Sequence, residues 1–128
     1  MLSHLYPVGS LAESGIPVAF GSDGPVIDPN PWPTIYNAVT RRTNSGNSLL
    51  TNASQEQAVT VAQALRMYTA AGAMAEGTGH NKGILQPGML ADLVLLDSDP
   101  INAEPEQLKE VRTSLTVLGG EVVWEDWS

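Results

Sequence analysis

The stretch "VAFGSDGPV", residues 18–26, joins an apolar run to an abrupt turn. The run begins at Ile16 and ends at Phe20 without alternation, which is typical of a strand covered on both faces. A Gly-Ser-Asp-Gly-Pro sequence follows it. Two interpretations of Asp23 are open: it shapes an ordinary Asx turn, or the strand delivers its carboxylate to a reaction.

The segments on either side predict an alternation of helices and strands. Residues 8–14 predict a short helix that ends at Gly15, and the apolar strand 16–20 follows directly. This order is typical of an α/β protein with parallel strands. Four prolines predict a loop over residues 24–34, and a helix is expected over 34–43, before a polar loop at 44–54.

The clearest helix is predicted to begin after Thr60. Gln63 stands three residues later, as a capping box requires. Glycines at 77 and 79 end the pattern, and small residues within it predict close approach to a neighbour. The stripe expected to pack has spacings of three and four and comprises Val61, Leu65, Tyr68, Gly72 and Ala75.

The chain becomes rich in β-signals after residue 80. A Pro87-Gly88 turn precedes a predicted strand in "ADLVLLD" (91–97), and "PEQLKEV" (105–111) predicts a short amphipathic helix. A hairpin is expected over 114–125, around the pair Gly119-Gly120. One α/β strand cannot form a sheet by itself, so the chain is interpreted as a piece of something larger.

Composition restricts the class of partner. The net charge is −8, with only six Lys and Arg residues, so neither nucleic acid nor an anionic membrane is an expected partner. The absence of cysteine excludes disulfides, thiolate metal sites and a cysteine nucleophile. No signal peptide or membrane-length apolar stretch is seen, and a cytoplasmic location is expected.

Hydrolysis by a serine nucleophile is disfavoured. A nucleophile elbow requires a glycine two residues before the serine, and Phe20 stands there before Ser22. It also requires a helix immediately afterwards, whereas Pro25 and a loop follow.

The histidines do not predict a complete metal site. Such a site needs three or more His or carboxylate ligands, and His4 and His80 stand in unrelated contexts. Each is interpreted as a surface histidine. The side chains of Trp32, Tyr36 and Arg41 either line a pocket or pack the proline-rich loop and its helix, and packing is favoured.

Four segments together resemble a known family: "SGIPVAFGSDGPV", "NPWPTIYNAVTRRT", "ALRMYTAAGA" and "KGILQPGMLADLVLLDSDP". In this order they resemble the C-terminal third of the metal-dependent amidohydrolases. The branch that they are most similar to is amidohydrolase family 3, which includes N-substituted formamide deformylase-like proteins. The resemblance extends from Tyr6 to Trp124.

The resemblance implies an α/β fold, namely the C-terminal fragment of a (β/α)8 hydrolase barrel with part of the accompanying small β-sandwich. Residues 1–80 correspond to the end of the barrel, with its last strand and following helices, and residues 81–128 to the C-terminal part of the sandwich. It implies that Asp23 contacts the catalytic metal and acts as general base and acid. Asp92 matches a structural position.

The family's His-x-His motif, its further metal-binding histidines and its bridging Lys or Glu have no counterpart in this sequence. The chain is therefore expected to be an incomplete fragment, inactive alone, of a hydrolase that cleaves C–N bonds in small amide-type substrates. The divalent metal of the whole enzyme is expected to be zinc. The alternative is a non-catalytic folded remnant that associates with itself. In either case unpaired strands predict a homo-oligomer.

Overall fold

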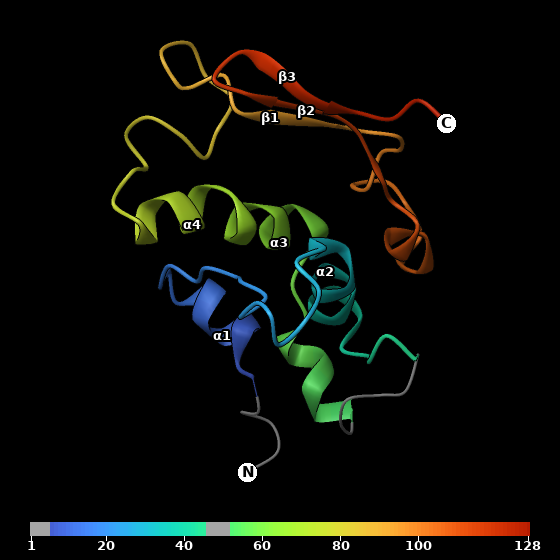
Figure 1. The fold of residues 1–128 in the computed structure, drawn as a ribbon. Coiled ribbons are helices and arrows are strands. Elements are labelled where there is room, and N and C mark those ends of the chain that lie inside the picture. The colour runs from blue at the N-terminus through green and yellow to red at the C-terminus, as the bar shows by residue number, and fades with distance from the viewer. Residues whose placement is uncertain (1–5, 46–51) are drawn as a thin grey trace.

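The computed structural model describes residues 6–45 and 52–128, with a helical part first and a sheet after it (Figure 1). None of the helices in these ranges combines the length and the apolar character needed to cross a bilayer. The helices are α1 (Val8–Glu13), α2 (Pro31–Thr40), α3 (Val61–Tyr68) and α4 (Ala70–Ala75), with the 3-10 helices η2 (Asn52–Gln57) and η3 (Pro105–Lys109). The strands are β1 (Leu93–Leu96), β2 (Thr113–Leu118) and β3 (Glu121–Glu125).

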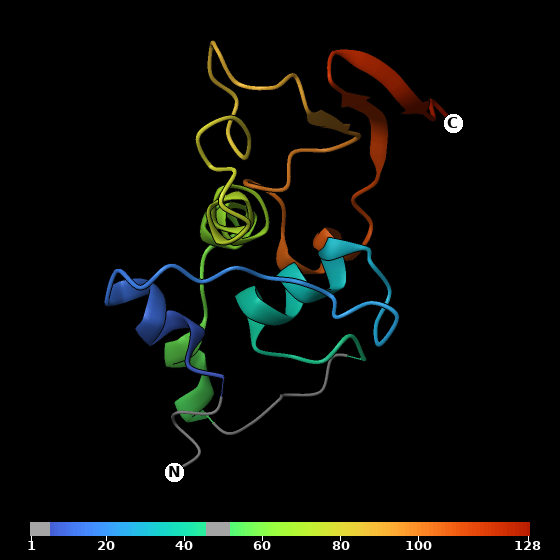
Figure 2. The same ribbon diagram turned by 60° about the vertical axis from the view of Figure 1, so that its left-hand side comes forward.

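The first helix ends as predicted, but the strand expected after it is not formed. Gly15 takes a φ of +76° directly after α1. Residues 16–20 are extended and belong to no sheet. Phe20 N–H donates to the Met67 carbonyl at 3.0 Å, so the segment crosses the helices α3 and α4 and does not lie beside a strand (Figure 2). A strand needs a neighbouring strand as its backbone partner, and the described part of the chain places none beside residues 16–20.

The second helix begins earlier than predicted. α2 starts at Pro31, inside the expected loop, because the Asn30 side chain accepts a hydrogen bond from Trp32 N–H at 3.1 Å. Proline is well suited to this first helical position, where its missing N–H costs nothing. The start of α2 therefore lies within the proline-rich segment that was predicted to be a loop. The helix ends at Arg41, which has a φ of +56°.

The capping box at Thr60 is confirmed. Gln63 N–H donates to Thr60 Oγ1 at 3.1 Å, and Thr60 N–H donates to Gln63 Oε1 at 2.8 Å. The expected single helix is divided at Thr69, whose hydroxyl donates to the Leu65 carbonyl at 2.8 Å. Such a bond competes with the helical ladder and often bends it. α3 and α4 nevertheless remain roughly in line (Figure 1).

The buried residues of α3 and α4 are Ala64, Met67 and Ala73. Val61, Leu65 and Tyr68 of the predicted stripe are partly buried and pack against the same core. Close approach to a neighbour is confirmed, at α4. A Cβ atom added to Gly83 would lie 2.8 Å from the Ala73 Cβ atom. Glycine is therefore required at position 83, where the segment after α4 passes close to that helix.

One cluster of buried side chains holds the helices and η3 together. Tyr36, Ile35 and Leu108 are fully buried at its centre. Its other members are Trp32, Ala38, Val59, Ala64, Met67 and Val111. The packing interpretation of Trp32 and Tyr36 is thus confirmed, and Arg41 is also buried. The cluster includes residues from both sides of position 80, where the domain boundary remains a prediction.

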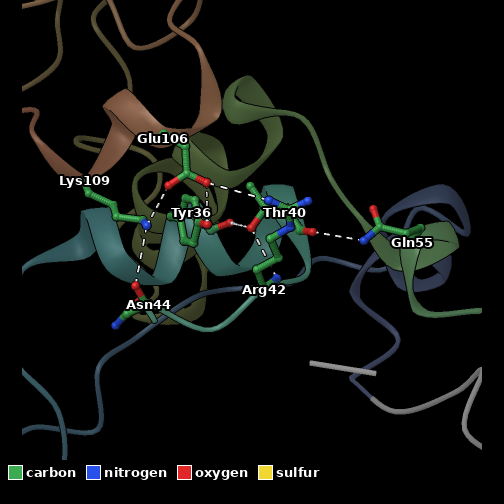
Figure 3. Close-up of polar contacts among 7 residues, drawn as sticks. All are labelled: Tyr36, Thr40, Arg42, Asn44, Gln55, Glu106 and Lys109. Carbon is green, nitrogen blue, oxygen red and sulfur yellow. Dashed lines mark hydrogen bonds and ion pairs between the residues drawn. The ribbon is translucent and has the colours of Figure 1, made fainter. Parts of the chain in front are cut away.

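A polar network links α2 to η3 beside this cluster (Figure 3). Tyr36 Oη donates to Glu106 Oε1 at 2.8 Å, and Lys109 Nζ lies 2.8 Å from Glu106 Oε2. Lys109 also lies 4.0 Å from the centre of the Tyr36 ring, a cation–π distance. The hydrogen bonds from Lys109 and Tyr36 lower the pKa of Glu106, and the Glu106 bond raises the pKa of Lys109.

The three strands form one antiparallel sheet in the order β1-β2-β3. The predicted hairpin is confirmed, with φ values of +60° and +87° at Gly119 and Gly120, as a primed turn requires. Asp92 Oδ1 accepts a hydrogen bond from Gly119 N–H at 2.7 Å, and Gly120 N–H donates to the Ala91 carbonyl. Asp92 therefore fixes the start of β1 to the hairpin tip, which confirms its structural role.

Some of the remaining local predictions are tested by the structure, and others fall on residues that it does not describe. Met89 N–H donates to the Gln86 carbonyl, which closes the predicted Pro87-Gly88 turn. The expected helix at 105–111 is the 3-10 helix η3. His4 and residues 46–51 of the predicted polar loop lie outside the described residues, and the end of that loop enters η2.

Truncating Leu108 tests the shared core. Leu108→Ala is expected to lower the free energy of unfolding by about 2–5 kcal/mol, because it leaves a cavity at a fully buried position. Urea denaturation measures the loss. Leu118→Ala is the matched control at an exposed site, with an expected change within about 0.5 kcal/mol. Equal effects of the two variants would contradict the assigned core.

The network predicts a pH dependence of stability. The pKa of Glu106 lies below 4.5 in the folded chain, so its contribution is present above its unfolded pKa and is lost as the pH falls through the folded pKa. The free-energy difference between the wild type and Glu106→Gln should therefore be largest near neutral pH and shrink below pH 4.5. Urea denaturation across the acid range measures it. Glu110→Gln, outside the network, is the control, and an equal pH-dependent difference there would refute the assignment.

Candidate functional site

Asp23 stands on a tight turn after the extended segment. Its φ is +52°, a left-handed conformation that Asp and Asn tolerate better than most residues. Val26 N–H donates to the Asp23 carbonyl at 2.9 Å and closes the turn, within which the Gly24–Pro25 peptide is cis. The Asp23 side chain is exposed.

The carboxylate of Asp23 does not form an Asx turn with the described residues. Asp28 and Asp99 do so, because each accepts a bond from the backbone N–H two residues on, at 2.8 Å and 2.9 Å. Asp23 accepts no such bond and has no ion pair within residues 6–45 and 52–128. Its turn is therefore held by the backbone, and its carboxylate oxygens do not stabilise the turn. A catalytic role for Asp23 stays a prediction.

The described residues do not assemble a metal site. No group of three or more His, Asp or Glu side chains in this part of the chain lies close enough to hold an ion. Asp23 is exposed before α2, and His80 is exposed on the turn after α4, as expected of a surface histidine. One carboxylate alone does not fit a divalent cation that takes three or more protein ligands.

The other candidates near Asp23 do not form a catalytic arrangement. Ser22 is half-buried, and no hydrogen bond joins it to His80, the histidine within the described ranges. Trp32, Tyr36 and Arg41 belong to the packed interior and line neither of the two clefts below. Burial also lowers the pKa of Arg41 by desolvation.

The larger cleft, of about 780 Å³, lies between α3–α4 and the segment 82–94. Most of its wall is apolar and includes Leu65, Ala73, Ile84, Leu85, Leu93 and Val94. Lys82 Nζ lies 2.7 Å from Glu76 Oε2 at its edge. Hydrogen bonds from Lys82 and Thr78 lower the pKa of this carboxyl.

Tyr68, one of the residues that line the larger cleft, has an unsatisfied polar atom. Its hydroxyl is buried and has no hydrogen-bond partner among the described residues. The Phe20 ring packs edge-on against it, with ring centres 5.6 Å apart. Sequence reasoning missed this cleft because its walls are far apart in the chain. Its apolar residues also give the same pattern as an ordinary core.

A smaller cleft of about 330 Å³ lies where the extended segment crosses the helices. Residues 15–18 form one wall. Met67, Ala70 and Met74 of α3 and α4 form the other. It contains no carboxylate, so it brings no group toward Asp23 that could share a metal or a proton.

Sequence comparison identifies similar proteins. The pattern of the amidohydrolase family matches residues 1–124. The N-substituted formamide deformylase of Arthrobacter pascens is 35% identical over 121 residues, which cover 94% of this chain and 22% of that protein. The putative amidohydrolase YtcJ of Bacillus subtilis (strain 168) is 29% identical over 119 residues, covering 91% of this chain and 22% of that protein.

A further relative has a different named activity. The 5-methylthioadenosine/S-adenosylhomocysteine deaminase of Syntrophomonas wolfei is 30% identical over 105 residues, covering 82% of this chain and 23% of that protein. No solved structure matches the chain significantly. The chain thus spans between 22% and 23% of the length of these relatives. Because the family pattern matches residues 1–124, nearly the whole sequence, the chain belongs to the amidohydrolase family.

Proposed function

We propose that this chain is the C-terminal part of a hydrolase that cleaves C–N bonds in small, non-peptide amides. The observation that carries the proposal is the similarity over 94% of the chain to a protein named for deformylation of N-substituted formamides. Deformylation and deamination both break a C–N bond with water, and relatives with both names match the chain. N-substituted formamides are the proposed substrate class.

The division at residue 80 belongs to this proposal. Residues 1–80 are assigned to the end of a (β/α)8 barrel and residues 81–128 to part of a small β-sandwich. In support, all four described α-helices precede residue 80, and all three described strands follow it. A cytoplasmic location of the whole enzyme is proposed on the same resemblance.

Asp23 is the proposed acid–base group. Its carboxylate is exposed at the end of an extended segment, and no described neighbour occupies its oxygens. Such a group can accept a proton from an attacking water and return it to the leaving amine. These two transfers are what amide hydrolysis requires of a single carboxylate.

A divalent metal, with zinc as the default for a site of His and carboxylate ligands, is proposed for the whole enzyme. Within residues 6–45 and 52–128, no group of three or more His, Asp or Glu side chains surrounds Asp23 or any other position, so these residues do not fit a metal site by themselves. We therefore assign no step of the reaction to the metal in this chain, and we propose that the isolated chain is inactive.

The second candidate function is non-catalytic. In this reading the chain is a folded remnant that associates with itself. The exposed apolar side chains of its sheet favour this, because an uncovered sheet face needs a partner. A homo-oligomer is compatible with both functions.

An assay of two polypeptides distinguishes the functions. One is this 128-residue chain. The other contains this chain within a polypeptide of the relatives' length. Release of formate and amine from an N-substituted formamide by the longer polypeptide alone is expected. Absence of hydrolysis by both, with the longer one folded and supplied with zinc, would favour the non-catalytic candidate.

Asp23→Asn in that longer polypeptide tests the acid–base role. Asn tolerates the left-handed turn but cannot accept the proton, so kcat should fall by about 10²–10⁴-fold while the fold persists. Ser22→Ala, one residue away, is the control and should retain kcat. Near-normal turnover of Asp23→Asn would make Asp23 a residue of the turn and nothing more.

Metal analysis of the purified 128-residue chain tests its ligand set. After desalting, less than stoichiometric zinc is expected, because a single carboxylate holds the ion weakly. If one equivalent were retained and then lost in Asp23→Asn, the chain would contain ligands that converge on Asp23. His80→Ala would then identify whether the exposed histidine is one of them.

A further inference from the structure

Asp23 and Gly24 form the only pair in the sequence in which a glycine follows an aspartate. In such a pair the backbone nitrogen of the glycine can reach the side-chain carboxyl carbon of the aspartate, because the glycine has no Cβ atom to obstruct the approach. Both residues are exposed on the turn after the extended segment, so water also reaches them. The sequence thus places one reactive pair of this kind, and the fold leaves it open to solvent.

The carboxylate of Asp23 differs from every other aspartate carboxylate in the chain. Each of the other five accepts a hydrogen bond from a backbone N–H group, and such a bond holds the carboxylate in one orientation. Within residues 6–45 and 52–128, Asp23 accepts no hydrogen bond through its side chain. Its carboxyl group is therefore free to rotate toward the following peptide nitrogen. The five engaged residues are Asp28, Asp92, Asp97, Asp99 and Asp126.

The nitrogen of Gly24 is also uncommitted. Its N–H donates to no backbone carbonyl in the part of the chain that the structure describes. The turn is closed by a different bond, from Val26 N–H to the Asp23 carbonyl at 2.9 Å. Contact between the Gly24 nitrogen and the Asp23 carboxyl carbon therefore requires no hydrogen bond of the turn to break first.

We propose that Asp23 is a site of spontaneous isomerisation to isoaspartate. The Gly24 nitrogen forms a bond to Asp23 Cγ, the bond from Cγ to its hydroxyl oxygen breaks, and the hydroxyl leaves as water with the amide proton. The cyclic succinimide then takes up one water. Opening at Cγ restores aspartate, whereas opening at the former backbone carbonyl carbon gives isoaspartate. Water is the only co-reactant, and nothing is oxidised or reduced.

Isomerisation would change the turn. The main chain would pass through Asp23 Cγ and gain one methylene group, and the former Asp23 carbonyl would become a free carboxylate. Val26 N–H would then lose the peptide carbonyl that accepts its bond. The modification does not depend on the proposed acid–base role of Asp23, but in the longer enzyme it would displace the carboxylate to which that role is assigned.

Peptide mapping by mass spectrometry tests the proposal on the purified 128-residue chain after storage in water enriched in heavy oxygen. Heavy oxygen and a second, isomeric form are expected in the peptide that contains Asp23. The peptide that contains Asp92 is the internal control and should show neither. Leu93 follows Asp92, and the Asp92 carboxylate is held by Gly119 N–H. Equal incorporation at Asp92 would overturn the assignment.

Gly24→Ala is the matched variant. A Cβ atom at this position would lie 3.5 Å from Ser22 Oγ, an ordinary contact, so the variant is expected to fold, and circular dichroism checks this. Its methyl group hinders the nitrogen, and isomerisation at Asp23 should fall severalfold. An unchanged rate in the folded variant would contradict attack by this nitrogen.

Asp23→Asn gives a second test that remains if Gly24→Ala does not fold. The same ring closes with loss of ammonia, a better leaving group than hydroxide, so aspartate and isoaspartate should appear at position 23 faster than isoaspartate appears in the wild type. Absence of heavy oxygen at Asp23 in the folded wild-type chain would overturn the proposal. The readout is a covalent change, so neither result depends on hydrolytic activity.

Discussion

The contact between Tyr36 and η3 joins the helical part of this chain to the segment that leads into β2. The Tyr36 side chain is fully buried, so its hydroxyl must find a partner or cost stability. Glu106, 70 residues away, supplies that partner, and Lys109 covers the ring. Leu108 of η3 is fully buried in the same core cluster as Tyr36. The position of the sheet depends on this contact, because η3 connects β1 to β2.

Signals confined to a few residues could be predicted from the sequence. The Thr60 capping box and the Gly119-Gly120 hairpin both formed as expected. In each case the residues that make the hydrogen bonds are those that carry the signal. Asp92 also behaves as expected, since its bond to Gly119 N–H requires only the turn that the glycines dictate.

Signals that depend on distant partners were less reliable. The apolar run 16–20 has the composition of a buried strand, yet a strand exists only when another backbone satisfies its N–H and C=O groups. The described residues supply two such bonds, from Ile16 to Leu11 and from Phe20 to Met67, and neither partner is a strand, so the segment stays a single extended run. The start of α2 was missed for a local reason, because Asn30 and Pro31 form a start signal that also fits a loop.

At the candidate site too, the local turn could be predicted from the sequence, whereas the partners of Asp23 from distant parts of the chain could not. The turn that presents Asp23 could be predicted from its glycines and proline, and the structure shows this turn held by the backbone. The groups that would share a metal or a proton with it could not be predicted, because they do not occur together in the described chain.

The exposed apolar surfaces have one physical cause. The larger cleft, the smaller cleft and the exposed apolar side chains of the sheet all lie where a locally formed element lacks a covering layer among the described residues. Helices and hairpins form from nearby residues, whereas burial of their apolar sides requires a second layer.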